Sequence, residues 1–150
     1  MPPIVAEGSV VYSQAPLFAG VPERILSLNP EARFVYVLRD PVCRTISHYW
    51  HRVYHWGEER GMFEAFSSDP EYTCASNYAL QLRSYLQHVS LERFFICTYE
   101  SLVADPQAQI TALCLWLGVD ANFLPRGLNT PVNVTPGVII QRPRYTLTGE

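Results

Sequence analysis

The amino-acid sequence predicts an α/β layered domain that is built around a parallel sheet. Two short segments, 33–39 with a continuous apolar core over 34–38, and 94–98, have the character of buried strands. Two helical patterns lie between these segments and a third follows the second. Because parallel strands must be joined by a crossover, the order strand, helix, helix, strand, helix favours parallel pairing. At 150 residues, we expect one domain over 1–150 with an irregular tail from about residue 119.

The first strand is predicted over Arg33 to Arg39. Its centre, Phe34-Val35-Tyr36-Val37-Leu38, is a run of β-branched, aromatic and aliphatic residues without a polar position. Such runs are typical of strands that are buried on both faces in parallel sheets. The run ends abruptly at Arg39-Asp40-Pro41, where a helix is expected to begin.

The first helix is predicted from its two ends. Asp40 suits the N-cap, Pro41 suits the first helical position, and the pattern runs to about Trp56 and ends near Gly57. The expected core face carries apolar side chains at helical spacing: Val42, Ile46, Tyr49, Trp50 and Val53. A second, polar stripe holds Arg44, His48, His51 and His55, with Ser47 beside it.

Residues 57–75 hold Gly57, Gly61 and Pro70, so we expect an irregular excursion with at most a short helical turn over 62–66. A lid is one role that such a segment can take. Ser76 is expected to cap the second helix, whose apolar stripe is Tyr78, Leu82, Tyr85, Leu86 and Val89.

The third helix follows the strand predicted over Phe94 to Thr98, and its two ends carry the clearest capping residues of the three helices. Asp105 suits the N-cap, Pro106 the first helical position and Gly118 the residue after the end. Its apolar stripe, Ile110, Leu113, Cys114 and Leu117, predicts a packing role.

Composition excludes several classes of protein. The chain is 48% hydrophobic and 17% charged, which is typical of globular proteins, and its net charge of −3 argues against a general nucleic-acid binder. No apolar run is long enough for a membrane span, and the first residues lack the pattern of a signal peptide. The four cysteines are too few for a disulfide framework and too widely spaced for a zinc knuckle, so we expect reduced thiols in the cytoplasm and no metal.

The junction between the first strand and the first helix is the candidate site for chemistry. Ligands in open α/β sheets bind beyond the carboxyl ends of the strands, and Arg39 is the last residue of such a strand. A helix N-terminus, a guanidinium and a hydroxyl two turns further on can together bind a phosphate. The alternative for Arg39 is an ion pair with Asp40 or a nearby glutamate.

The junction Arg39-Asp40-Pro41-Val42-Cys43-Arg44-Thr45-Ile46-Ser47-His48-Tyr49 resembles the 3′-phosphate-binding motif of sulfotransferases that use 3′-phosphoadenosine-5′-phosphosulfate as donor. The segments 21–25 and 99–106 look like the flanking segments of the same family. The resemblance covers roughly residues 7 to 120 and is nearest to bacterial and heparan sulfate sulfotransferases. It implies a P-loop NTPase-like parallel sheet flanked by helices.

By this resemblance, Arg39 and Ser47 bind the 3′-phosphate of the donor and of its product, adenosine 3′,5′-bisphosphate. The segment from Glu7 to Tyr12 is similar to the family's Glu-Lys-Ser/Thr-x-x-Tyr segment, whose carboxylate takes the acceptor's proton, although Gly8 stands at the Lys position. Glu7 is then the candidate base, with an ordinary surface acid as the alternative. The implied activity is transfer of a sulfonyl group to a hydroxyl or amine of a carbohydrate or small molecule, without a metal.

Weaker candidates for the nucleotide site each have an ordinary structural alternative: Arg44 (a structural arginine), His48 (a polar helix face), Tyr78 (core packing), and Arg142 and Arg144 (solvated tail residues). His48, His51 and His55 share a helix face, but no carboxylate or cysteine accompanies them, which argues against zinc.

Two departures from the family pattern bear on whether this chain is an active enzyme by itself. All eleven basic residues are arginines, and only six residues precede Glu7, so we expect the strand-loop-helix with a lysine that wraps the 5′-phosphosulfate to be missing. The chain then looks like a truncated sulfotransferase, or alternatively like a non-catalytic remnant that keeps only the 3′-phosphate half-site. A P-loop kinase or nucleoside triphosphatase fragment is a further alternative, but it should show Gly-Lys-Ser/Thr and a Walker-B acid, and neither is present.

Overall fold

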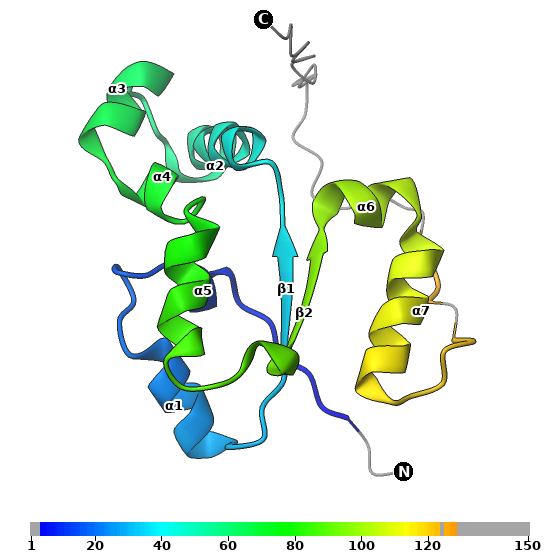
Figure 1. The fold of residues 1–150 in the computed structure, drawn as a ribbon. Coiled ribbons are helices and arrows are strands. Elements are labelled where there is room, and N and C mark those ends of the chain that lie inside the picture. The colour runs from blue at the N-terminus through cyan, green and yellow to red at the C-terminus, as the bar shows by residue number, and fades with distance from the viewer. Residues whose placement is uncertain (1–3, 124, 129–150) are drawn as a thin grey trace, which may run out of the picture.

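The fold, seen in a computed structural model that describes residues 4–123 and 125–128, is a pair of parallel strands flanked by helices (Figure 1). Strand β1 (Phe34–Leu38) pairs with β2 (Phe94–Thr98), with Phe34 opposite Phe94 and Leu38 opposite Thr98. The α/β class and the parallel pairing are as predicted. In the described part of the chain the sheet has these two strands alone.

The other regular elements of the described chain are helices. Before β1 come η1 (Val10–Ser13) and α1 (Val21–Leu28); between the strands come α2 (Pro41–Trp56), α3 (Met62–Ser68), α4 (Glu71–Cys74), α5 (Tyr78–Leu86) and η2 (Leu91–Arg93); after β2 come α6 (Tyr99–Ala104) and α7 (Pro106–Leu117). Helices α1 and α5 lie on one side of the strands and α7 on the other, while α2 begins beyond the carboxyl end of β1 (Figure 1). No helix in the described residues is long and apolar enough to cross a membrane.

Helix α2 has the predicted ends but a different buried face. The Asp40 carboxylate accepts a hydrogen bond from the Cys43 N–H at 2.8 Å, and Gly57 closes the helix with a φ of +69°. The buried residues are Thr45 and Tyr49, whereas Val42 is 51% exposed, so the predicted stripe is wrong at its first position. Thr45 is buried because its hydroxyl bonds the Ser76 hydroxyl at 2.8 Å and the Tyr72 carbonyl at 3.3 Å.

Most of the segment 57–75 is helical, whereas the sequence predicted an irregular segment. It forms α3 and α4, which pack on α2 and bury Ala65 and Tyr72 completely beside Tyr49. Gly61 and Pro70 lie at the N-caps of α3 and α4, so the residues that predicted a loop mark the starts of two short helices instead.

Helix α5 is capped by Asn77 and not by Ser76, and it ends at Leu86, before Val89. The Asn77 side chain accepts a hydrogen bond from the Leu80 N–H at 3.2 Å. Gln81, which is 1% exposed, reaches back to residue 15: its carbonyl accepts from the Ala15 N–H at 2.7 Å and its amide donates to the Ala15 carbonyl at 2.8 Å. A polar residue therefore fixes α5 to the segment that follows η1.

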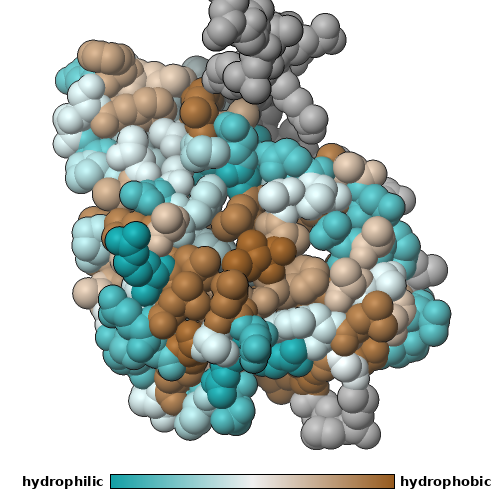
Figure 2. Space-filling view, in the orientation of Figure 1, coloured by the Kyte–Doolittle hydropathy of each residue, from teal (hydrophilic) through white to brown (hydrophobic). Residues whose placement is uncertain are grey.

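The sequence predicted that strand β1 is buried on both faces, and this prediction is wrong. Val35 and Val37 are 50% and 44% exposed, because α7 covers β2 and leaves this face of β1 open. The opposite face is packed, with the Phe34 ring 5.1 Å from Tyr85 and 4.9 Å from Phe94 between centroids. Figure 2 shows hydrophobic residues gathered at the centre of one view, over the strands and beside α5.

Helices α1 and α6 were not predicted. Gly20, with a φ of +70°, precedes α1, and Pro22 lies in its first turn. Thr98 and Ser101 form a reciprocal cap at the start of α6. This cap uses serine where the usual sequence signature has glutamate or glutamine, so the pattern escapes a search for that signature.

Candidate functional site

The candidate site lies where both strands end. Because Leu38 is opposite Thr98, the residues that follow β1 lie beside those that follow β2. The Asp40 backbone N–H donates to a carboxylate oxygen of Glu100 at 3.1 Å, which links the start of α2 to the start of α6. The carboxyl end of the sheet thereby gathers residues that are far apart in the sequence.

Arg39 is held at this edge without being neutralised. Its guanidinium carbon lies 4.9 Å from the centroid of the Tyr99 ring, and its backbone N–H donates to the Tyr78 hydroxyl at 3.2 Å. Within the described ranges, Arg39 forms no ion pair with an acidic residue. The structural alternative for Arg39, an ion pair with Asp40 or a glutamate, is therefore not found there.

The two nearest acids are occupied by backbone donors. Asp40 accepts from the Cys43 N–H, and Glu100 accepts from the Asp40 N–H. The bond from Cys43, together with the weaker influence of the Arg39 charge, holds the pKa of Asp40 below its usual value, so this carboxyl stays ionised as a helix cap. The donors of the Arg39 guanidinium remain available for an external anion.

Ser47 lies further along α2. It is six residues beyond Pro41, about 9 Å along the helix axis, and its side chain is half-buried. Its hydroxyl makes no hydrogen bond to a residue that the structure describes, so this donor too is uncommitted. No direct contact joins Ser47 to Arg39, and the two groups would meet only through a ligand.

Arg44 and His48 face α4. An Arg44 guanidinium nitrogen lies 3.3 Å from His48 Nδ1 and donates to the Tyr72 carbonyl at 3.4 Å. Burial, followed by the charges of Arg44 and Arg52, lowers the pKa of His48 to about 4. His48 is therefore neutral at physiological pH and packs against the Tyr72 ring at 5.0 Å between centroids.

The other two histidines of this helix are exposed. The rings of His51 and His55 lie 4.6 Å apart between centroids, near the end of α2. Among the residues that the structure describes, no three His, Cys, Asp or Glu side chains are grouped so that they could hold a metal ion.

Tyr78 has the packing role that was one alternative for its sequence position, and its hydroxyl also reaches the candidate site. Its ring packs edge-on against Tyr36 at 6.0 Å, and its hydroxyl accepts the Arg39 N–H. This contact joins the packed face of the sheet to the candidate site.

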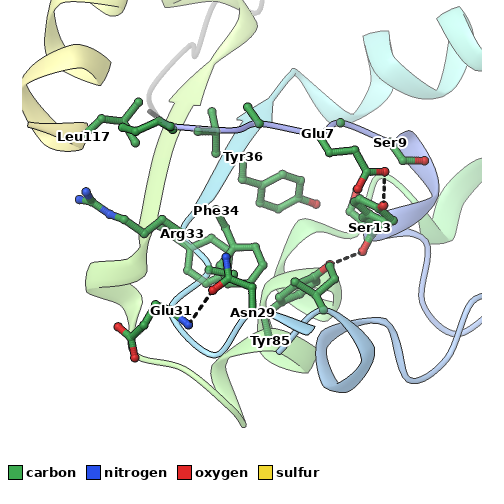
Figure 3. A pocket seen from close by; sticks show the side chains of 18 of the residues that line it. Glu7, Ser9, Ser13, Asn29, Glu31, Arg33, Phe34, Tyr36, Tyr85 and Leu117 are labelled. Carbon is green, nitrogen blue, oxygen red and sulfur yellow. Dashed lines mark hydrogen bonds between the residues drawn. The ribbon is translucent and has the colours of Figure 1, made fainter. Parts of the chain in front are cut away.

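Glu7 lies apart from Arg39 and Ser47 and makes no hydrogen bond or ion pair with either. Its carboxylate accepts from the Tyr12 hydroxyl at 2.5 Å, a bond that raises the pKa of Tyr12. The Tyr12 carbonyl in turn accepts from the Tyr85 hydroxyl at 2.7 Å. This chain of contacts fixes Glu7 at the edge of a cavity of about 690 Å³ (Figure 3). Arg142 and Arg144 lie outside the described residues.

Sequence reasoning missed Tyr99 and Glu100 as parts of the site. The signal that would have found them is the parallel pairing itself, because the carboxyl ends of adjacent parallel strands meet at one edge. Arg39 directly follows β1 and Tyr99 directly follows β2, so their proximity follows from the strand register.

Comparison with known proteins identifies a family and similar solved structures. A model described as "Sulfotransferase family" matches residues 7–122. The crystal structure of a sulfotransferase from Alicyclobacillus acidocaldarius is similar to this chain, with a TM-score of 0.70 and 28% sequence identity. That match covers 78% of this chain and 51% of the other, so the chain spans about half the length of that structure. No curated protein matches the chain.

Proposed function

The chain belongs to the sulfotransferase family, and on that premise we propose that it binds 3′-phosphoadenosine-5′-phosphosulfate at the carboxyl end of β1 and transfers its sulfonyl group to an acceptor. Arg39 and Ser47 hold the 3′-phosphate in this proposal. The fold is then the P-loop-like parallel sheet of that family. We also propose that the protein works in the cytoplasm, where its four cysteines, all free thiols, would stay reduced.

The observation that carries the proposal is the state of Arg39. A guanidinium that is stacked on Tyr99, while the neighbouring acids bond to backbone N–H groups, has its charge and its fork of donors free for a phosphate. The N-terminus of the sixteen-residue helix α2 follows at once and adds the positive end of its dipole. The uncommitted hydroxyl of Ser47 supplies a further donor.

Glu7 is the proposed base. The donor supplies an activated sulfonyl group, whose bond to the bridging phosphate oxygen breaks as the acceptor oxygen bonds to sulfur, and the electron pair leaves on that phosphate oxygen. Glu7 takes the acceptor's proton, which makes the attacking oxygen a stronger nucleophile. The bond from Tyr12 fixes one carboxylate oxygen and leaves the other free for this proton.

A second candidate function is a binding module that keeps the nucleotide site but does not transfer the sulfonyl group. One observation favours it: the 150 residues of this chain include no lysine to stabilise the departing phosphate. The two candidates share the 3′-phosphate site and differ only in turnover. Formation of a sulfated acceptor from the donor nucleotide is the measurement that separates them.

Calorimetric titration with adenosine 3′,5′-bisphosphate tests the shared site. We expect micromolar binding, a tenfold to hundredfold loss in Arg39→Ala, and a two- to tenfold loss in Ser47→Ala, as for one charged and one neutral hydrogen bond. Adenosine 5′-monophosphate, which lacks the 3′-phosphate, should bind about as weakly to the unaltered chain as the bisphosphate binds to Arg39→Ala.

Arg83→Ala is the matched control, because Arg83 is an exposed arginine of α5 away from the site. If Arg83→Ala and Arg39→Ala weakened binding equally, the nucleotide would be attracted by net charge, and the proposed site would be wrong. Circular dichroism of each variant verifies that it is folded.

A further inference from the structure

Arg39 has both of its flanking peptide groups fixed by side chains from elsewhere in the chain. The peptide group before its Cα carries the Arg39 N–H, which donates to the Tyr78 hydroxyl at 3.2 Å. The peptide group after its Cα carries the Asp40 N–H, which donates to the Glu100 carboxylate at 3.1 Å. Because peptide groups are planar, fixing the planes on both sides of a Cα fixes the two backbone dihedral angles of that residue. Tyr78 and Glu100 therefore set the direction in which the Arg39 side chain leaves the backbone.

Glu100 is itself held in place by its surroundings. It lies in the first turn of α6, which begins directly after β2 (Figure 1). The reciprocal cap fixes this turn, since the Ser101 N–H donates to the Thr98 hydroxyl at 3.1 Å and the Thr98 N–H donates to the Ser101 hydroxyl at 3.3 Å. Thr98 in turn lies opposite Leu38, the last residue of β1. The sheet register and the cap together hold the Glu100 carboxylate beside the backbone of Asp40.

The negative charge of Glu100 works against a phosphate site. A carboxylate beside an anion-binding arginine weakens the attraction of that site for a phosphate, because like charges repel. Within the described ranges, Glu100 forms no ion pair with Arg39 or with another arginine. Its carboxylate accepts the Asp40 N–H instead, and a hydrogen bond to an ionised acceptor is about twice as strong as a neutral one. The charge therefore strengthens a contact that fixes the backbone next to Arg39.

We propose that Glu100 is a positioning residue for the nucleotide: it fixes the peptide group that follows Arg39, so that the guanidinium is already in place when the 3′-phosphate arrives. This inference rests on the proposed function, since it concerns the same phosphate. Glu100 acts through Arg39 and does not touch the ligand. Ordering a long side chain on binding costs affinity, and avoiding that cost accounts for about a three- to tenfold gain.

Calorimetric titration of the full chain with adenosine 3′,5′-bisphosphate distinguishes a positioning residue from a nearby acid. Glu100→Ala removes both the acceptor and the charge, and we expect the nucleotide to bind about three- to tenfold more weakly. Glu100→Gln keeps an acceptor oxygen and should bind within twofold of the unaltered chain. If Glu100 were only a nearby acid, both substitutions would relieve repulsion. Unchanged or tighter binding in Glu100→Ala would therefore overturn the proposal.

A double-mutant cycle tests whether Glu100 acts through Arg39. When Arg39→Ala is already present, adding Glu100→Ala should change the affinity less than twofold, because the side chain that Glu100 positions is gone. An equal loss with and without Arg39→Ala would mean that Glu100 acts on the ligand or on the fold directly, which contradicts the proposal. Glu92→Ala is the matched control, since Glu92 is an exposed glutamate that precedes the other end of β2, and it should change the affinity less than twofold.

A second variant covers the case in which circular dichroism shows that Glu100→Ala is unfolded. Glu100→Asp keeps the charge but is one methylene shorter, which withdraws the carboxylate from the Asp40 N–H. It should bind the nucleotide at least threefold more weakly, and an unaltered affinity would overturn the proposal. Loss of binding in Arg39→Ala with undiminished binding in Glu100→Ala would reject the positioning role and leave the proposed function standing. Absence of binding to the unaltered chain would reject the proposed function itself, and the positioning role with it.

Discussion

Gln81 shows how much of this structure depends on single polar side chains. It is almost completely buried, and its amide satisfies both backbone groups of Ala15 and the Cys74 carbonyl, at distances of 2.7–3.0 Å. The predicted core stripe of its helix passed over this position, because a glutamine carries no apolar signal. Its importance comes from partners that are remote in sequence, which local patterns do not reveal.

Gln81→Leu should therefore be strongly destabilising. The substitution leaves the N–H and the carbonyl of Ala15 without these partners and removes one of the two donors to the Cys74 carbonyl, which still accepts from the Asn77 N–H. We therefore expect the free energy of unfolding to fall by roughly 3 kcal/mol in urea denaturation. Gln87→Leu is the control, since Gln87 is exposed at the end of the same helix. Similar losses in both variants would mean that the buried hydrogen bonds of Gln81 contribute little.

His48 predicts a pH dependence of stability. Its pKa is about 4 in the folded chain, against 6.5 as the ordinary value, because of burial and the charges of Arg44 and Arg52. Between these values the unfolded chain binds a proton that the folded chain does not, so the free energy of unfolding decreases as the pH falls from about 6.5 to about 4. The negative charge of Asp69 opposes this lowering of the His48 pKa without abolishing it, and the Glu71 carboxylate lies 3.9 Å from His48 Nε2.

His48→Gln should remove part of that dependence. Between pH 7 and pH 4.5, the loss of stability measured by urea denaturation should be about 2 kcal/mol smaller in this variant than in the unaltered chain. His55→Gln, at an exposed position of the same helix, should keep the original slope. A His48→Gln slope equal to that of the unaltered chain would show that His48 is protonated when folded.

At the scale of the elements, the ends of helices were predictable and their packing was not. Asp40, Gly57, Asp105 and Gly118 cap α2 and α7 as their sequence positions predict, because capping is a contact over a few residues. The same reasoning failed over 57–75, where two helices of seven and four residues have little intrinsic stability and are fixed by burial of Ala65 and Tyr72.

The cap of α7 gives a test at this scale. The Asp105 carboxylate accepts from the Ala108 N–H at 2.9 Å, so Asp105→Ala should lower the free energy of unfolding by about 1 kcal/mol. Asp105→Asn keeps an acceptor oxygen and should retain most of the stability. An equal loss in both variants, measured by chemical denaturation, would assign the effect to charge and not to the hydrogen bond.

The whole molecule has two separately packed regions. One is built within 41–74, where Tyr49, Ala65 and Tyr72 form a buried cluster together with Phe66. The other lies on the sheet, where Phe34 and Phe94 meet Tyr85. The sequence predicted the sheet and its parallel order because both strands are apolar runs that need a crossover, but the first region depends on side chains of 57–75 that showed no helical period.

Hydrogen exchange should resolve these two regions. Phe66 packs against Tyr49 and Tyr72 at 6.0 and 5.4 Å between ring centroids, so Phe66→Ala should speed amide exchange in α3 and α4 and leave β1 and β2 unchanged. Phe95→Ala, which removes a contact with Trp116 at 5.9 Å, should do the reverse. Acceleration of both regions by either variant would mean that the molecule opens as one unit.

The pairing of β1 with β2 also bears on synthesis of the chain. Phe34 finds its partner Phe94 only 60 residues later, and every helix from α2 to α5 is made in between. At translation rates of about 5–20 residues per second, roughly 3–12 s pass between the synthesis of β1 and the synthesis of β2. The five apolar residues of β1 are unpaired during that time. Over that interval the apolar run stays without its partner strand on the nascent chain, and the cluster of Tyr49, Ala65 and Tyr72, which lies within 41–74, has time to pack first.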